Sequence, residues 1–226
     1  MILNDKKLII FDFDGTLIDS VPDLANSINF MLSKLRRSTH DIDLIRAWVG
    51  NGATTLVKRS LMGKGEFIED EINKNLFEQA LPIFLEHYET NSCVETFLYE
   101  GVQDTLEVLK GRGFTMVIVT NKPYKFIAPI LSSLGIEEYF DLLIGADSLK
   151  EKKPSAEPLL HVMKELSFTK EETLMVGDSK NDIIAAKNAQ IDSVAVSYGY
   201  NYGQDIGLYA PTIVIEKFSN ILEHLN

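Results

Sequence analysis

The sequence predicts an α/β protein in which a Rossmann-like parallel sheet forms the core and an all-helical cap domain is inserted after the first strand. Short apolar runs recur along the chain and alternate with segments of helical period, which is typical of βαβ units with helices on both faces of a sheet. Residues 17–96 break this alternation, because they show helical periodicity and no convincing strand.

The core elements follow from the apolar runs. Residues 7–12 form a short run that ends in a glycine turn, which indicates a buried strand. Similar runs predict strands at 115–119, 142–144, 173–176, 193–196 and, last, 211–215. Helical periodicity predicts helices at 102–110, 124–134, 157–166 and 181–188, with a further helix after the last strand.

The insert shows helical periodicity around residues 24–35, 42–49, 54–61 and 72–88. We therefore divide the chain into an α/β core, residues 1–16 and 97–226, and a helical cap domain, residues 17–96. An insert after the first strand lies over the carboxyl edge of the sheet, where open α/β sheets bind their ligands. The cap is thus placed to act as a lid.

The composition favours a cytoplasmic protein. The chain has 226 residues, of which 45% are hydrophobic and 24% charged, as is ordinary for a globular protein. Its longest apolar runs are too short to span a bilayer, and polar residues 4–7 interrupt any N-terminal signal core. A single cysteine, Cys93, means that disulfides within one chain do not build the fold.

The net negative charge of the chain disfavours anionic macromolecules and membranes as partners. With 22 basic and 33 acidic residues the net charge is −11, which disfavours general binding to nucleic acid or to an anionic membrane. We expect a small-molecule partner and a monomer or homodimer. An anionic substrate would need a locally positive site made by a metal ion, by a few Lys or Arg side chains, or by helix N-termini.

Four polar motifs follow predicted strands. They are Asp12-Phe13-Asp14-Gly15-Thr16, Thr120-Asn121, Lys153-Pro154 and Gly177-Asp178-Ser179-Lys180-Asn181-Asp182. Because the carboxyl ends of parallel strands share one edge of the sheet, we expect these motifs to converge. Carboxylates gathered there repel one another unless a cation lies among them. Oxygen ligands with no His or Cys nearby indicate Mg²⁺.

The same residues suit phosphoryl transfer. Lys153 adds a positive charge, and Thr120 and Asn121 have groups that donate hydrogen bonds to phosphate oxygens. Asp12 is a carboxylate that can attack phosphorus and form an aspartyl-phosphate. Asp14, two residues on, can protonate the leaving alcohol and then deprotonate the hydrolytic water.

Two further positions of the first motif support this chemistry. Gly15 lets the chain turn sharply, so that Asp14 points inward. Thr16 we place among the supporting residues.

At this point the chain resembles a known family. The four motifs in this order look like those of the haloacid-dehalogenase-like phosphohydrolases. The stretch Trp48-Val49-Gly50-Asn51-Gly52-Ala53 resembles the cap of bacterial phosphoglycolate phosphatases, as do residues 113–123 and 152–154. The resemblance covers nearly the whole chain.

The resemblance implies a role for each motif residue. Asp12 would be both nucleophile and metal ligand, and Asp14 both acid/base and a metal ligand through its backbone carbonyl. Asp178 would be the third protein ligand, and Asp182 a supporting carboxylate near the metal. Lys153 would bind the phosphoryl group and shield Asp12.

Two departures from the family pattern stand out. Gln190 follows Ala189 where the family often has glycine, which leaves the end of that helix open, because glycine at a helix end usually adopts a left-handed φ. Residues 155–157 also differ from the usual proline-containing version, but Lys153 is untouched.

The expected substrate is 2-phosphoglycolate, hydrolysed to glycolate and phosphate. The core motifs offer nothing specific to its far carboxylate, so we expect Gly50, Asn51 and Gly52 in the cap to bind it. The alternatives are a pyrophosphatase or a β-phosphoglucomutase-like enzyme of the same superfamily, or a non-catalytic module that binds a phosphometabolite. Asp14 argues against dehalogenation, because the dehalogenases of the family lack this second acid.

Overall fold

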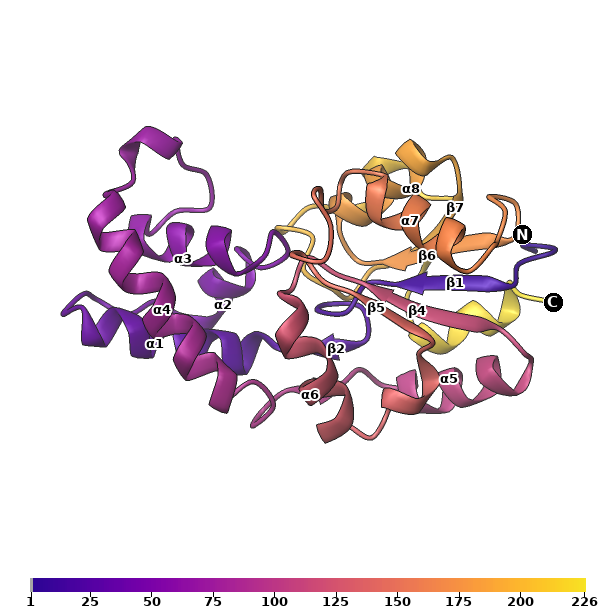
Figure 1. Cartoon of the computed structure of the whole chain (residues 1–226), viewed down its shortest axis with the longest axis horizontal. Coiled ribbons are helices and arrows are strands. Elements are labelled where there is room, and N and C mark those ends of the chain that lie inside the picture. The colour runs from indigo at the N-terminus through magenta and orange to yellow at the C-terminus, as the bar shows by residue number, and fades with distance from the viewer. Residues whose placement is uncertain (1) are drawn as a thin grey trace.

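A computed structural model describes residues 2–226 and shows one sheet of six parallel strands in the order β5-β4-β1-β6-β7-β8 (Figure 1). The strands are β1 (Leu8–Phe11), β4 (Thr115–Val119), β5 (Leu142–Ile144), β6 (Thr173–Gly177), β7 (Asp192–Val196) and β8 (Ile213–Ile215). The chain builds outward from β1 to β5 and then returns to build β6 to β8 on the other side. The reversal makes the β1–β6 boundary a switch point, where such sheets bind ligands at their carboxyl edge.

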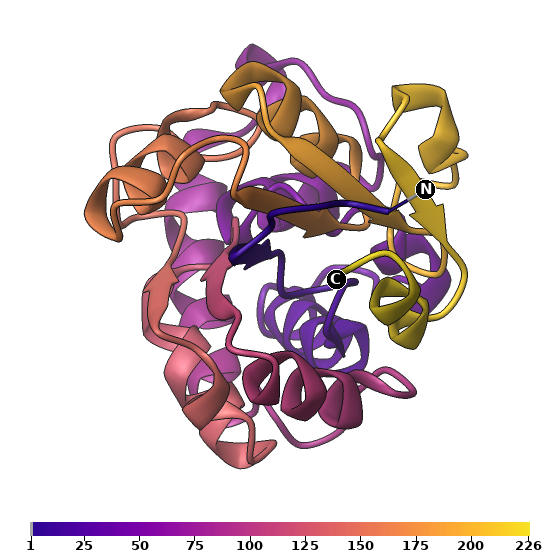
Figure 2. The ribbon, with the colours of Figure 1, turned by 90° about the vertical axis from the view of Figure 1, so that its right-hand side faces the viewer.

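Helices cover both faces of the sheet (Figure 2). Side chains alternate along β1: Ile9 and Phe11 pack on the face covered by α5 (Val102–Gly111) and α6 (Ile127–Ser133). Leu8 and Ile10 pack on the opposite face, under α7 (Glu157–Glu165) and α8 (Lys180–Ala189). Both sets are fully buried, which explains why the strand has a continuous apolar sequence. The predicted α/β class is confirmed.

Four helices lie beyond the carboxyl ends of the strands, on the left in Figure 1. They are α1 (Val21–Lys34), α2 (Ile42–Arg46), α3 (Ala53–Met62) and α4 (Lys74–Thr90). Helix α1 packs against α2, α3 and α4, and α3 also packs against α4. Local sequence explains their ends, since Asn73 caps α4 and Gly63 ends α3 in the left-handed conformation. The exact domain boundaries stay a prediction.

Two details differ from the expectation. Strand β2 (Ile18–Asp19) lies within the segment predicted to contain no strand, and it pairs antiparallel with β3 (Phe97–Leu98). Strands of two residues are too short to produce a periodic pattern. The predicted C-terminal helix is a 3₁₀ segment, Phe218–Glu223, which packs on α5. Within residues 2–226, no helix is long and apolar enough to cross a membrane.

Candidate active site

The first motif continues directly from β1. The backbone N–H of Asp12 donates to the carbonyl of Val176 at 2.9 Å, so the ladder between β1 and β6 holds this residue at the sheet edge. Gly15 turns the chain at φ +87°, and a Cβ there would collide with the carboxylate of Asp178. The glycine is therefore needed both for the turn and for the close approach of the fourth motif.

Lys153 joins the third motif to the first and the fourth. Its buried ammonium lies 2.8 Å from Asp12 Oδ1 and 2.6 Å from Asp182 Oδ1. Burial, together with the charge of Asp182, raises the pKa of Asp12 to about 7, although Lys153 opposes this shift. Burial alone would lower the pKa of Lys153, but the two carboxylates outweigh it and raise that pKa, which keeps the ammonium charged.

Asp178 is held rigidly at the carboxyl end of β6. The Thr16 hydroxyl donates to its Oδ1 at 3.1 Å, and the backbone N–H of Tyr200 donates to its Oδ2 at 2.5 Å. Gly199 lets the backbone pass against this side chain, where a Cβ would collide with it. Burial and the neighbouring charges of Asp12 and Asp182 raise the pKa of Asp178 well above its usual value.

The three carboxylates fit a metal ion. One oxygen each from Asp12, Asp178 and Asp182 lies within 4.8 Å of the others, in a group with no His or Cys. Asp12 Oδ1 is buried, and the Lys153 ammonium lies 2.8 Å from it. This oxygen and the raised carboxylate pKa values are what an oxygen-liganded cation would satisfy.

Asp182 is engaged differently from the other two. Its Oδ1 accepts from Lys153, and its Oδ2 accepts from both the backbone N–H and the hydroxyl of Ser179, at 3.0 and 2.7 Å. These contacts form a capping box at the start of α8. The geometry therefore supports a direct ligand role for Asp12 and Asp178 and the expected supporting role for Asp182; all three roles stay predictions.

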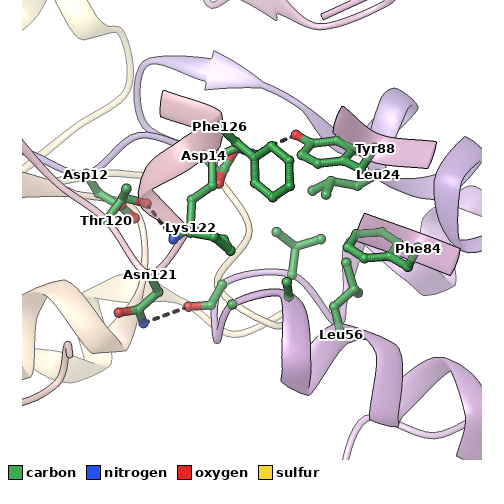
Figure 3. A pocket seen from close by; sticks show the side chains of 15 residues that line it. Asp12, Asp14, Leu24, Leu56, Phe84, Tyr88, Thr120, Asn121, Lys122 and Phe126 are labelled. Atoms are coloured by element: carbon green, nitrogen blue, oxygen red, sulfur yellow. Dashed lines mark hydrogen bonds and ion pairs between the residues drawn. The ribbon is translucent and has the colours of Figure 1, made fainter. Parts of the chain in front are cut away.

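Asp14 has partners that the sequence did not reveal. Its Oδ1 accepts from Lys122 Nζ at 2.8 Å and from Ser20 Oγ at 2.5 Å. The Lys122 ammonium also donates to the Tyr88 hydroxyl of α4 at 2.7 Å (Figure 3). A lysine directly after Thr120-Asn121 at a strand end was a usable signal for Lys122, whereas nothing in the sequence pointed to Ser20 or Tyr88.

Asn121 connects the core to the cap loop. Its side-chain Nδ2 donates to the carbonyls of Gly50 and Lys153, each at 3.1 Å, so both of its amide protons are already used. Thr120 lies beside it and lines the same cavity as Asp12. Binding of substrate by Thr120 and Asn121 stays a prediction, and the amide geometry favours the Thr120 hydroxyl as the donor.

The cap loop approaches the core very closely. Gly50 and Gly52 have φ values of +116° and +87°, and a Cβ on them would lie 2.7 Å from Tyr202 Oη and from the Asn121 carbonyl oxygen, respectively. Asn51 points elsewhere: its carbonyl accepts from Lys152, and its side chain accepts from Tyr202. Of the three, Gly50 and Gly52 line the central cavity.

That cavity lies between the sheet edge and the cap helices. Asp12 and Asp14 lie at its core end, and Tyr88 faces it from α4 (Figure 3). Its remaining walls are largely apolar: Leu24, Val49, Leu56, Phe84 and Phe126. The cavity thus combines two carboxylates and the Lys122 ammonium with a largely apolar wall, as is typical of small-molecule sites.

A parallel sheet whose carboxyl edge carries clustered carboxylates and a buried lysine is an α/β fold with a site of the kind that hydrolytic enzymes use on phosphate compounds. The family model described as haloacid dehalogenase-like hydrolase matches residues 9–196. The chain belongs to this family, and the resemblance seen in the four motifs is confirmed.

Relatives with similar sequences share one description. A protein of Colwellia psychrerythraea (strain 34H) named phosphoglycolate phosphatase is 50% identical over 222 residues, with 98% of both chains covered. One of Psychrobacter arcticus with the same name is 46% identical over 221 residues, covering 98% of this chain and 96% of that protein. A solved structure, described as a predicted phosphoglycolate phosphatase from Haemophilus somnus 129pt, has a TM-score of 0.91 at 38% identity, with 98% of both chains covered.

Proposed function

We propose that the protein is a phosphoric monoester hydrolase that converts 2-phosphoglycolate to glycolate and phosphate, with Mg²⁺ as cofactor and an aspartyl-phosphate as intermediate. One observation carries this proposal: the buried carboxylate of Asp12, 2.8 Å from the Lys153 ammonium, lines the same cavity as Asp14. The names of the two relatives and of the solved structure support the choice of substrate.

The chain's own residues divide the reaction into two steps. Asp12 attacks phosphorus, the bond to the leaving oxygen breaks, and Asp14 gives its proton to that oxygen. Asp14 then takes a proton from water as the water oxygen attacks phosphorus, which releases phosphate and restores the Asp12 carboxylate. Lys153, 2.8 Å from Asp12, holds a positive charge beside the phosphoryl oxygens throughout.

A magnesium ion would be held by the side chains of Asp12 and Asp178, with the backbone carbonyl of Asp14, and Asp182 would support it. Bound there, it would neutralise the carboxylates and withdraw charge from the phosphoryl oxygens.

A panel of phosphate compounds tests the assignment. Phosphate release from 2-phosphoglycolate, pyrophosphate, glucose phosphates and p-nitrophenyl phosphate would be measured with Mg²⁺ and after chelation. We expect the highest kcat/KM for 2-phosphoglycolate and loss of activity in chelator.

Each alternative would give a different result. A tenfold preference for pyrophosphate or a hexose phosphate would overturn the substrate, and transfer of phosphate back to a sugar would indicate the mutase. Full activity in chelator would rule out the metal, and binding without turnover would indicate the non-catalytic module. The cytoplasmic location and the monomeric or homodimeric state stay predictions from the sequence.

A further inference from the structure

Lys122 is the one cation among the described residues that line the central cavity. Its side chain is buried, with 5% of the residue exposed, and its ammonium donates to Asp14 and to the Tyr88 hydroxyl. The ammonium also lies 4.9 Å from the centre of the Tyr88 ring. The ion pair with Asp14 stabilises the charged form of this ammonium.

The position of this charge relative to the reacting atoms is what matters. In the proposed mechanism, Asp14 gives its proton to the leaving oxygen. Lys122 Nζ lies 2.8 Å from Asp14 Oδ1, on the side of Asp14 that faces Tyr88 (Figure 3). A substituent on the first carbon of the leaving alcohol therefore comes within reach of the ammonium. In 2-phosphoglycolate that substituent is the carboxylate.

The surroundings of Lys122 favour an ion pair between its ammonium and a second carboxylate, that of the substrate. An ammonium has three protons, and Asp14 and Tyr88 take two of them in the hydrogen bonds that the structure records for this group. The nearby walls of the cavity, Leu24, Phe84 and Phe126, cannot solvate a carboxylate. A buried carboxylate without a cation is costly, whereas a charge-assisted hydrogen bond stabilises it.

The cap loop is less suited to this task than the sequence suggested. The Gly50 carbonyl is directed to the amides of Asn121 and Asn181, and Asn51 is held by Lys152 and Tyr202. The loop is thus engaged with the core and offers the substrate no side-chain cation.

We propose that Lys122 determines the specificity of the enzyme for a small leaving group that carries a carboxylate, by binding that carboxylate while Tyr88 orients the ammonium. The assignment rests on the proposed function, because Asp14 must be the residue that serves the leaving oxygen. It adds a substrate contact on the core side of the cavity, outside the four sequence motifs.

The test compares two substrates that differ only at this substituent: 2-phosphoglycolate and 2-hydroxyethyl phosphate, in which a neutral alcohol replaces the carboxylate. Lys122→Met also disturbs Asp14, but that effect applies to both substrates and cancels in the ratio of their kcat/KM values. We expect this ratio to fall by about 10- to 100-fold, the size of a charge-assisted contact. Lys122→Arg should restore part of it.

Two further variants complete the design. Lys125→Met removes a lysine that is exposed and paired with Glu89, and it should leave the ratio unchanged. Tyr88→Phe removes only a hydroxyl, so it provides the same test if Lys122→Met does not fold. We expect it to lower the ratio of the two kcat/KM values by about 2- to 10-fold.

The outcomes separate this assignment from the function on which it rests. Equal losses on both substrates, in Lys122→Met or in Tyr88→Phe, would overturn it and leave Lys122 as a positioning residue for Asp14. Failure of the wild-type enzyme to hydrolyse 2-phosphoglycolate would instead overturn the proposed function.

Discussion

Asp12, the proposed nucleophile, is a buried carboxylate beside a lysine. It also lies beside Asp182, and its Oδ1 is 2.8 Å from the Lys153 ammonium. Asp12→Asn keeps the volume of the side chain but removes the charge and the ability to form an acyl-phosphate. We expect kcat to fall by about 10³-fold or more, with the thermal midpoint little changed. Steady phosphate release by a clean Asp12→Asn sample would mean direct attack by water.

A single residue at the end of α8 stores backbone strain. Gln190 occupies the left-handed region at φ 61°, ψ 42°, the conformation that glycine adopts at this position of a helix at no cost. Gln190→Gly should raise the free energy of unfolding by about 1 kcal/mol, as measured by urea denaturation. Gln190→Ala is the matched control, because it also removes the contact with Lys170 but keeps the strain. A glycine variant no more stable than the alanine variant would refute this explanation.

At the scale of elements, one buried carboxylate links the two chain segments that join the cap helices to the sheet. Asp23, in the first turn of α1 and 1% exposed, accepts hydrogen bonds from the backbone N–H groups of Val94, Glu95 and Thr96 and from the Thr96 hydroxyl, at 2.7 to 3.1 Å. The chain leaving the cap is thereby tied to the chain entering it, beside the β2–β3 ribbon.

Asp23→Asn should loosen this tie, because one of its oxygens becomes an NH₂ group that faces N–H donors. We expect a loss of about 2 to 4 kcal/mol in unfolding free energy and faster amide exchange at residues 94–96. Asp104→Asn changes an exposed acid in the first turn of α5 and should cost far less. Equal effects of the two substitutions would show that the hydrogen bonds of Asp23 contribute nothing special.

The loop before α3 gives a second element-scale prediction. Gly52 has a positive φ, and a Cβ there would lie 2.7 Å from the backbone carbonyl oxygen of Asn121, which cannot move aside cheaply. Gly52→Ala should therefore lower kcat/KM for 2-phosphoglycolate and p-nitrophenyl phosphate by similar factors, since the clash separates cap from core. Gly113→Ala has the same type of φ but open space around it, and it should leave both rates unchanged. If kcat/KM fell for 2-phosphoglycolate alone, this loop rather than Lys122 would be the contact of the substrate carboxylate.

The sequence predicted best those features that a local pattern of apolar residues determines. Strands such as β1 and β6 are apolar runs buried on both faces, so their composition marks them, and a parallel sheet then brings Asp12, Lys153 and Asp178 to one edge. The β2–β3 ribbon was not predicted, because strands of two residues are too short to show a periodic pattern. The contact of Lys122 with Tyr88 was not predicted either. It depends on how α4 packs over the sheet, and the spacing of residues in the sequence does not reveal that packing.

At the scale of the whole molecule, the cap rests on the core through polar contacts around the cavity. Tyr88 accepts from Lys122, Gly50 accepts from Asn121, and Asn51 accepts from Lys152. Cap and core residues together line the cavity, so we expect a substrate to enter when these contacts separate and to be shielded from water when they re-form. We infer that the structure represents the closed arrangement of a lid whose hinges lie near residues 16–18 and 94–99.

This inference predicts a ligand-dependent change of shape. Beryllium fluoride with Mg²⁺ mimics the phosphoryl group on Asp12 and should favour closure, because the ligand contacts both parts only when they are together. We expect a smaller radius of gyration by small-angle X-ray scattering and slower amide exchange in 94–99 and around Gly50. Asp12→Asn, which cannot form the adduct, should show neither change and serves as the control. Identical scattering and exchange with and without the analogue in the wild-type protein would mean that the cap is fixed, and substrate would then have to enter the cavity by local motion of side chains such as Tyr88.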